Sequence, residues 1–229
     1  MSPAEAFPKA WPWITAVIGV TVLLLVFMPD HTVVGVLIIC ILVGLTWLFW
    51  WLNRPMFTFI SVEKVLTIQD VDGKVAKLLR YQTARANHKG ITEFWCRNIS
   101  ADGSIDNILI DDQAPFQVRK EAGDTQVCKR FDPPLRRGQI FETVLSYELH
   151  DSFPARHEGI IHVVEGHTRK VRLVVTLPEA RKPKNGRTFL RYGGQVHKEL
   201  AAPKIIGSRL EFETTRLKLG GEYCLEWDW

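Results

Sequence analysis

Two long apolar runs, separated by three residues, dominate the first quarter of this 229-residue chain. The first extends from Trp11 to Met28 and the second from Thr32 to Leu52. Each is long enough to cross a hydrocarbon layer of ~30 Å as a helix that rises about 1.5 Å per residue. The pattern therefore predicts a transmembrane helical hairpin over residues 11–52, with helices at 11–28 and 32–52.

The charges around the two runs predict an orientation. Lys9 precedes the first run, and Arg54 and Lys64 follow the second, whereas the connector carries only Asp30 and His31 as ionisable residues. Basic flanks stay on the cytoplasmic side of a membrane. The sequence thus predicts a multi-pass protein of the inner (plasma) membrane, with the tail 1–10 and both chain termini in the cytoplasm.

Tryptophans gather at the outer ends of the two runs. In an up-and-down hairpin they would share one membrane interface and act as interfacial anchors; they are Trp11, Trp13, Trp47, Trp50 and Trp51. Neither run contains an intramembrane charge of the kind that lines an ion or substrate pathway. The hairpin is therefore interpreted as an anchor in the lipid bilayer and not as a transporter.

Beyond a linker at 53–61, the apolar pattern changes to a period of two. Apolar residues alternate with polar ones from Phe141 to Leu149 and from Tyr223 to Trp229, and pairs such as Asn185-Gly186 supply turns between such runs. The pattern predicts an all-β, antiparallel cytoplasmic domain over 62–229. An immunoglobulin-like sandwich is the first choice and a lipocalin-like barrel the alternative.

The predicted strands leave little room for helix. They lie at 62–69, 74–84, 92–98, 105–110, 116–119, 125–130, 139–149, 159–164, 170–177, 188–191, 204–214 and 222–229. The best helical segment, from Val196 to Ala202, is short and ends at Pro203.

No motif in the sequence predicts catalysis. A Gly-x-Ser-x-Gly elbow and a phosphate-binding glycine loop are both absent. His157, His162 and His167 are five residues apart, so on a strand they would alternate between faces and could not share a metal ion. We therefore predict no enzyme, no catalytic residue, no metal and no cofactor. A net charge of +4 does not suggest a nucleic-acid polymer as partner.

A basic stretch near residue 185 is the candidate binding site. It contains arginines and lysines next to an aromatic side chain: Arg181, Lys182, Lys184, Arg187, Arg191 and Tyr192. Anionic lipid headgroups would attract such a segment, and an anionic small ligand such as a signalling nucleotide would use arginine forks and an aromatic stacking surface. A solvated loop that only keeps the domain soluble is the third interpretation.

The order of parts, a hairpin at 11–52 followed by a β-rich module at 62–229, resembles the two-transmembrane β-effectors of bacterial antiphage signalling. In that family a β-barrel binds a cyclic oligonucleotide, and the assembled helices damage the inner membrane. The stretch from Thr92 to Pro178 is also similar to membrane-tethered immunoglobulin-like modules related to acyl-lysine readers. Both resemblances cover the layout and no individual motif, so they assign no binding residue.

Two functions from different classes follow. The first is a membrane-anchored, non-enzymatic β-sandwich module on the cytoplasmic face that binds a protein partner or associates with itself. The second is an antiphage-type effector, in which the β domain senses a ligand and clusters the helices to perturb the membrane. The sequence favours the first, because uncharged helices without a polar stripe give no basis for a water-filled pore.

Overall fold

The computed structural model describes residues 32–52, 54–121, 124–215 and 217–229, and the chain divides into two units, Met1–Arg54 and Pro55–Trp229. In the first unit, helix α2 (Thr32–Leu52) coincides with the second apolar run. Its Thr46 hydroxyl donates to the Leu42 carbonyl (2.6 Å), and apolar side chains such as Val43 are exposed.

The structure contradicts the predicted membrane hairpin. Within the described ranges, no helix combines the length and the apolarity that a membrane crossing requires. We therefore correct the prediction of a transmembrane hairpin at 11–52, and with it the multi-pass inner-membrane location that depended on it. An apolar run shows that a segment avoids water, but it does not determine whether lipid or protein covers it.

Parts of that prediction cannot be located. The tail 1–10, the first predicted helix at 11–28 and the anchors Trp11 and Trp13 lie outside the described residues. Trp47 of α2 is 61% exposed. Trp50 and Trp51 belong to α2, but their side chains are not described. The anchoring role of these tryptophans depended on the corrected hairpin.

The second unit is built almost entirely from strands. In chain order they are β1 (Phe57–Ile68), β2 (Val75–Ala86), β3 (Ile91–Ile99), β4 (Ser104–Ile110), β5 (Gln117–Glu121), β6 (Asp124–Leu135), β7 (Ile140–His150), β8 (His157–Val163), β9 (Val171–Thr176), β10 (Asn185–Tyr192), β11 (Gln195–Glu199), β12 (Lys204–Ile206), β13 (Arg209–Thr214) and β14 (Glu222–Asp228). A short 3-10 helix, η2 (Glu179–Arg181), lies between β9 and β10.

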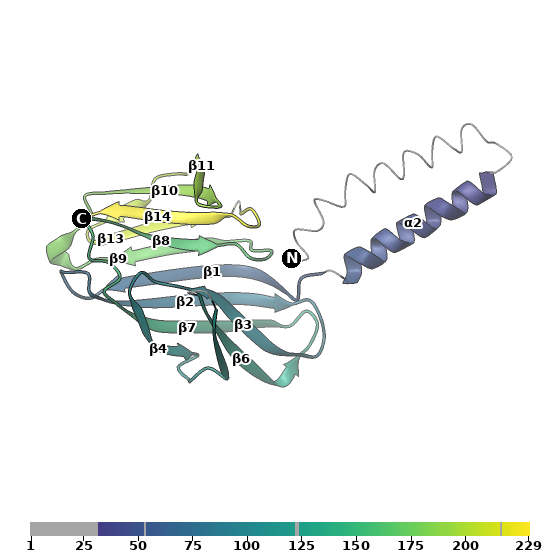
Figure 1. The fold of residues 1–229 in the computed structure, drawn as a ribbon, viewed down its shortest axis with the longest axis horizontal. Coiled ribbons are helices and arrows are strands. Elements are labelled where there is room, and N and C mark those ends of the chain that lie inside the picture. The colour runs from purple at the N-terminus through teal and green to yellow at the C-terminus, as the bar shows by residue number, and fades with distance from the viewer. Residues whose placement is uncertain (1–31, 53, 122–123, 216) are drawn as a thin grey trace. The chain divides into compact units, whose positions relative to one another are not determined.

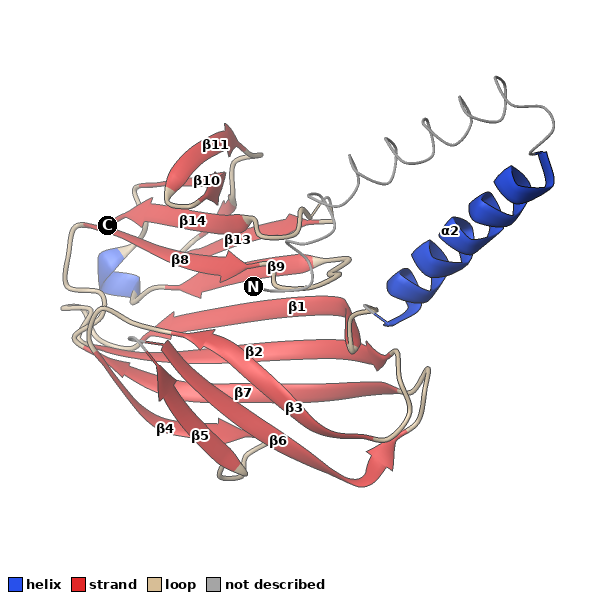
Figure 2. Ribbon diagram, turned by 45° about the vertical axis from the view of Figure 1, so that its right-hand side comes forward, coloured by secondary structure: helices blue, strands red, loops and turns tan. Residues whose placement is uncertain are grey.

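The strands form three sheets (Figure 1). The largest has seven strands in the order β12-β13-β9-β1-β2-β7-β4. A four-stranded sheet, β11-β10-β14-β8, and a three-stranded sheet, β3-β6-β5, complete the unit, and Figure 2 shows them over different parts of the large sheet. Lys64 and Arg80 are cross-strand partners in the large sheet; Lys64 bonds Ile161 of β8 and Arg80 bonds Arg97 of β3. Both small sheets therefore cover the same face of the large one.

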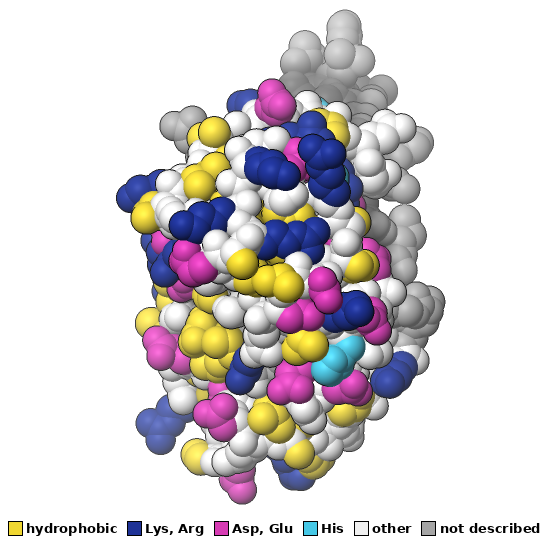
Figure 3. Space-filling model, turned by 90° about the vertical axis from the view of Figure 1, so that its left-hand side faces the viewer, with side chains coloured by type: hydrophobic (Ala, Val, Ile, Leu, Met, Phe, Trp, Pro, Cys, Tyr) yellow, Lys and Arg dark blue, Asp and Glu magenta, His cyan; other side chains and the backbone are white. Residues whose placement is uncertain are grey.

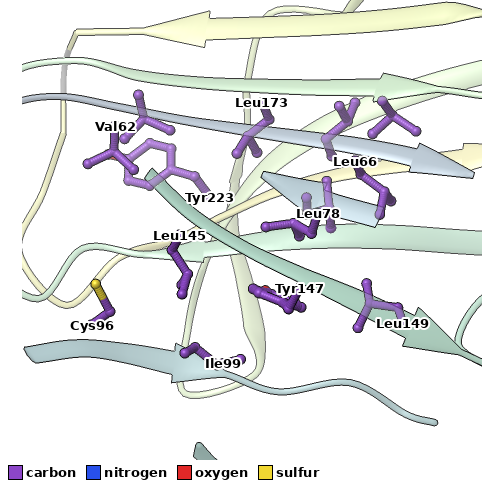
Figure 4. Packing of buried hydrophobic residues seen from close by; sticks show 14 of the residues in the cluster. Val62, Leu66, Leu78, Cys96, Ile99, Leu145, Tyr147, Leu149, Leu173 and Tyr223 are labelled. Atoms are coloured by element: carbon purple, nitrogen blue, oxygen red, sulfur yellow. The ribbon is translucent and has the colours of Figure 1, made fainter. Parts of the chain in front are cut away.

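Alternation of side chains along each strand determines which face is covered. In β1, the side chains of Val62, Leu66 and Ile68 are buried, whereas the intervening Glu63 and Thr67 are only half-buried. Figure 4 shows the core between the sheets, with Ile99 and Cys96 of β3 on one side of Leu145 and with Tyr223 of β14 beside Val62. The opposite face carries ion pairs, such as Arg172 with Glu63 (3.1 Å) and Glu211 (2.9 Å).

The all-β prediction is consistent with the structure, but the predicted architecture is not. An immunoglobulin-like sandwich has two sheets, whereas the described strands form three, and they do not close into a lipocalin-like barrel. The strands are also not all antiparallel, because β1 pairs in parallel with β9. Alternation indicates which side chains point inward, but it carries no information on which strands become neighbours.

Three local predictions also differ from the structure. The predicted linker 53–61 contains the start of β1, which begins at Phe57. The predicted helical segment from Val196 to Ala202 contains most of β11, whose side chains are all exposed. The predicted strand 204–214 is divided into β12 and β13 by Gly207, whose φ of 60° is favourable for glycine in a tight turn.

Asp124 stabilises an irregularity at the end of β3, and its loss should lower stability. Its carboxylate accepts from the backbone N–H of Ile99 (2.9 Å) and of Asn98 (3.4 Å), where Asn98 has a φ of 55°. An Asp124→Ala change leaves these N–H groups without an acceptor, and we expect it to lower the free energy of unfolding by about 1–3 kcal/mol in urea titrations. Asp124→Asn keeps one acceptor oxygen and should lose less than half of that. Equal stability of wild type and Asp124→Ala would contradict this assignment.

Candidate functional site

The predicted basic site does not form a single cluster, because most of its side chains contact other residues of the chain. Arg181 stacks on the Trp229 ring, with its guanidinium carbon 3.5 Å from the ring centre, and donates to the Val71 carbonyl (2.8 Å). Lys182 pairs with Glu179 (3.1 Å), and Lys184 donates to the terminal Trp229 carbonyl (3.2 Å). Arg181 and Lys184 thus hold Trp229 in place, whereas Lys182 contacts its neighbour Glu179 in η2.

The remaining predicted residues lie on β10. Arg187 pairs with Glu226 of β14 (3.1 Å) and Arg191 with Glu222 (3.1 Å), because the register places each pair directly opposite across the two strands. Tyr192 packs edge-on against His197. Basic side chains do gather in the upper part of the surface in Figure 3. However, none of the six predicted residues lines the groove along β8, the cavity on the opposite face of the large sheet or the small interior cavity beside Arg80.

The largest of these cavities is a groove of about 520 Å³ between the two small sheets. One wall is β8, the edge strand of the four-stranded sheet, and the other is the end of β3, the edge strand of the three-stranded sheet, with the loop through Ala101. Leu78 and Tyr147 of the large sheet also line the groove. The groove exists because neither small sheet extends across the middle of the large one.

The wall formed by β8 offers free backbone groups. Val164 N donates to the Gly221 carbonyl (3.0 Å) and Trp229 N to the Arg156 carbonyl (3.3 Å), which sets the phase of the ladder with β14. Bonded pairs alternate along an antiparallel ladder, so Gly159 and Ile161 direct their N–H and C=O groups away from β14. The Ile161 carbonyl accepts from the Lys64 ammonium (2.7 Å), which ends the open part of this edge.

Acidic side chains lie at the mouth of the groove. Burial raises the pKa of Glu158, and the nearby negative charge of Asp102 raises it further. The Glu158 carboxylate accepts from the Ala155 N–H (2.6 Å), whereas Asp102 makes no ion pair with any residue that the structure describes. Two neighbouring carboxylates, neither of which forms an ion pair among the described residues, favour a positively charged occupant.

His157 lines the groove, and its ring also contacts two acidic side chains of β14. Its ring nitrogens contact Asp228 (2.8 Å) and Glu226 (3.0 Å), and Glu226 also binds Arg187. The hydrogen bond to Asp228 is the main reason why the pKa of His157 is raised. Gly159 lies next to this network, and a Cβ there would be 3.0 Å from the Glu226 Cγ. A side chain at Gly159 would therefore crowd Glu226, which also lines the groove.

Three basic side chains lie in the interior behind the closed end of the groove. Lys64 and Arg80 are 5% exposed and His162 is 7% exposed. Burial, with the charge of Arg80, lowers the pKa of Lys64 to about 7, and burial also holds the pKa of His162 well below its ordinary value. Glu165, which lines the small cavity beside these side chains, accepts from the Asn98 amide (2.5 Å).

Sequence reasoning did not identify the groove or this basic cluster. The position of Lys64 could have been predicted from the sequence. It lies in the same alternating phase of β1 as Val62 and Leu66, so its side chain must point inward. The spacing of His162 from its neighbouring histidines argues against a shared metal ion, but it does not show that His162 is buried. Among the described residues there is no group of three His, Cys, Asp or Glu side chains that could hold a metal ion.

A second cavity, of about 410 Å³, lies on the opposite face of the large sheet. It is lined by residues such as Glu63, Tyr81, Glu142 and Arg172. Arg172 is already paired with two carboxylates there. We therefore regard the groove along β8 as the stronger candidate site.

Comparisons with known proteins identify no family. No family model matches the sequence, and no curated protein matches it. Solved structures with a similar arrangement include an M1 zinc metallopeptidase from Deinococcus radiodurans (11% identity, TM-score 0.39, 75% of this chain and 42% of that one). Others are yeast LTA4 hydrolase (10%, 0.41, 76% and 29%) and a Legionella pneumophila protein described as nutrient binding (8%, 0.43, 75% and 67%). The chain spans less than half the length of both peptidase-type structures, and similarity at this level carries no argument about function.

Proposed function

We propose that the β unit is a non-enzymatic binding module that takes up an extended, basic segment of a partner protein along the free edge of β8. The observation that carries the proposal is the groove of about 520 Å³ beside an unpaired strand edge. Extended peptides bind other domains by adding a strand to such an edge, with backbone hydrogen bonds giving affinity and neighbouring side chains giving specificity.

The contacts of the groove support each part of this proposal. Free N–H and C=O groups of Gly159, together with the free Ile161 N–H, would pair with the backbone of the segment. Asp102 and Glu158 would attract its basic side chains, and Leu78 and Tyr147 provide an apolar surface for the side chains between them. Lys64 limits the length of the added strand, because it already bonds the Ile161 carbonyl.

The proposal is tested with labelled peptides of about nine residues, a usual strand length, by fluorescence anisotropy on the full-length protein. One peptide alternates Lys with Val, a second alternates Glu with Val, and a third repeats the first with alternate backbone nitrogens methylated. We expect the Lys peptide to bind at least ~10-fold more tightly than either of the others, which corresponds to about 1.4 kcal/mol. Equal binding of the methylated peptide would show attraction by charge alone and overturn the proposal.

A variant pair tests the position of the site. Ile161→Pro removes an N–H that makes no bond to β14, so the protein should stay folded while affinity for the Lys peptide falls at least ~10-fold. Ile161→Thr keeps that N–H and should bind as wild type does. Circular dichroism on both variants checks the fold, and unchanged affinity in folded Ile161→Pro would exclude β8 as the binding edge.

A further inference from the structure

The interior behind the groove contains a small cavity of about 30 Å³, whose lining includes several basic side chains and one acidic side chain, Glu165. Lys64 of β1, Arg80 of β2 and His162 of β8 all border it. Lys64 and Arg80 are direct cross-strand partners, so they lie side by side on the covered face of the large sheet. His162 comes from the opposite layer, and the charges of Lys64 and Arg80 both act on it.

Two nitrogen atoms in this cluster have no hydrogen-bond partner among the described residues. They are Nε of Arg80 and Nε2 of His162. An arginine remains charged in a protein, and its Nε always carries a hydrogen. The guanidinium NH1 group of Arg80 donates to the Arg97 carbonyl (2.9 Å), which leaves its Nε without an acceptor among the described residues. A buried donor without an acceptor is costly, and a charged one more so, which indicates that an occupant of the cavity accepts from it.

The nearby carboxylates do not neutralise the cluster. Glu165 also lines the cavity and interacts electrostatically with Lys64 and Arg80, but it forms no ion pair with either, its carboxylate accepts from Asn98, and burial raises its pKa. Asp124 is used by the backbone N–H groups at the end of β3. Within the described part of the chain, no ion pair is formed by Lys64 or Arg80. Arg80 is therefore a buried guanidinium without any described carboxylate in direct contact.

We infer that this cavity binds one chloride ion. Its volume of about 30 Å³ is enough for one or two spheres of water size, which need roughly 10–15 Å³ each. A monatomic halide fits this space, whereas phosphate and nucleotides do not. The ion accepts from Arg80 Nε and from the Nε2-protonated tautomer of His162, and it compensates the charge of Arg80. This inference is independent of the proposed binding function, because it concerns the interior and not the groove.

The test compares thermal unfolding of the full-length protein in chloride, bromide and gluconate at equal ionic strength. Binding at about ten times the dissociation constant should raise the midpoint by roughly 2–4 °C in chloride and bromide relative to gluconate, with saturation at higher concentration. Identical midpoints in the three salts would mean that water fills the cavity, and would overturn the inference.

Two variants and one crystallographic measurement locate the effect. Arg80→Met should abolish the halide dependence, whereas Arg85→Met, on the same strand but in the opposite phase, should retain it. Crystals of the wild-type protein grown in bromide should show an anomalous peak between Arg80 and His162. This measurement decides the matter even if Arg80→Met does not fold, because the absence of the peak at saturating bromide contradicts the assignment.

Discussion

Replacing Trp227 by alanine is expected to lower the free energy of unfolding by about 3–5 kcal/mol, which is typical of truncating a buried aromatic side chain. Trp227 is fully buried, and its ring lies 6.2 Å from that of Phe153. The cavity left by the indole could not fill with water, because its surroundings are largely apolar. Urea unfolding followed by circular dichroism measures the change.

Trp227→Phe provides the matched comparison. The indole N–H of Trp227 has no hydrogen-bond partner among the described residues, so phenylalanine removes an unsatisfied donor together with some buried volume. We therefore expect Trp227→Phe to lose less than half as much stability as Trp227→Ala. Tyr81→Ala, at a site that is 41% exposed, should change stability by less than ~1 kcal/mol. A loss below 1 kcal/mol in Trp227→Ala would contradict the packing described here.

Stability should rise by about 1.5 kcal/mol when the pH increases from about 7 to 8.5 in chloride-free buffer, because of Lys64. Its pKa is about 7 in the native protein and 10.5 in the unfolded chain. Between these values the unfolded chain binds a proton that the native state has released, so raising the pH favours the native state. Arg80, Glu165 and His162 are the charged and titratable groups that face Lys64, and the low pKa of His162 places its titration below this window.

Lys64→Met should remove this pH dependence. The pKa difference corresponds to on the order of 4 kcal/mol at pH 7, since each pKa unit is worth about 1.4 kcal/mol. Loss of the bond to the Ile161 carbonyl offsets part of this, so the variant should be more stable than wild type by about 1–3 kcal/mol. The measurement stays below about pH 8.5 because buried groups such as Cys224 (pKa about 11) and Tyr147 (pKa about 12) oppose the trend at higher pH. An equal slope in both proteins would show that Lys64 is not its source.

The positions of most strands could be predicted from the alternation of apolar and polar residues, but the pairing of each strand with its neighbours could not. The segments around Leu145 and Trp227 alternate clearly and coincide with β7 and β14. The division of the fold into three sheets depends on which strand edges meet, and a period of two is the same whether a strand pairs in parallel or antiparallel. The apolar run at 32–52 correctly predicted helix α2, but its composition did not determine what covers it.

The candidate site was predicted in the wrong place for a physical reason. A cluster of charges in the sequence, such as Arg187 with Arg191, is visible without knowledge of the partners that neutralise it, and Glu226 and Glu222 are more than thirty residues away. The groove depends on the free edges of β3 and β8. An edge is free because no further strand pairs with it, and the sequence pattern does not show which strands remain unpaired on one side. Only the inward phase of Lys64 could have been read directly from the sequence.

The parallel pairing of β1 with β9 joins Val62 to Val171, so the middle of the largest sheet needs segments that are about a hundred residues apart. Ribosomes add ~5–20 residues per second, and β1 would therefore wait on the order of 5–20 s for its neighbour during synthesis. Throughout that interval one side of a long, apolar strand can pair with another nascent chain. Chaperone demand and aggregation should consequently be greatest before residue 171 leaves the exit tunnel.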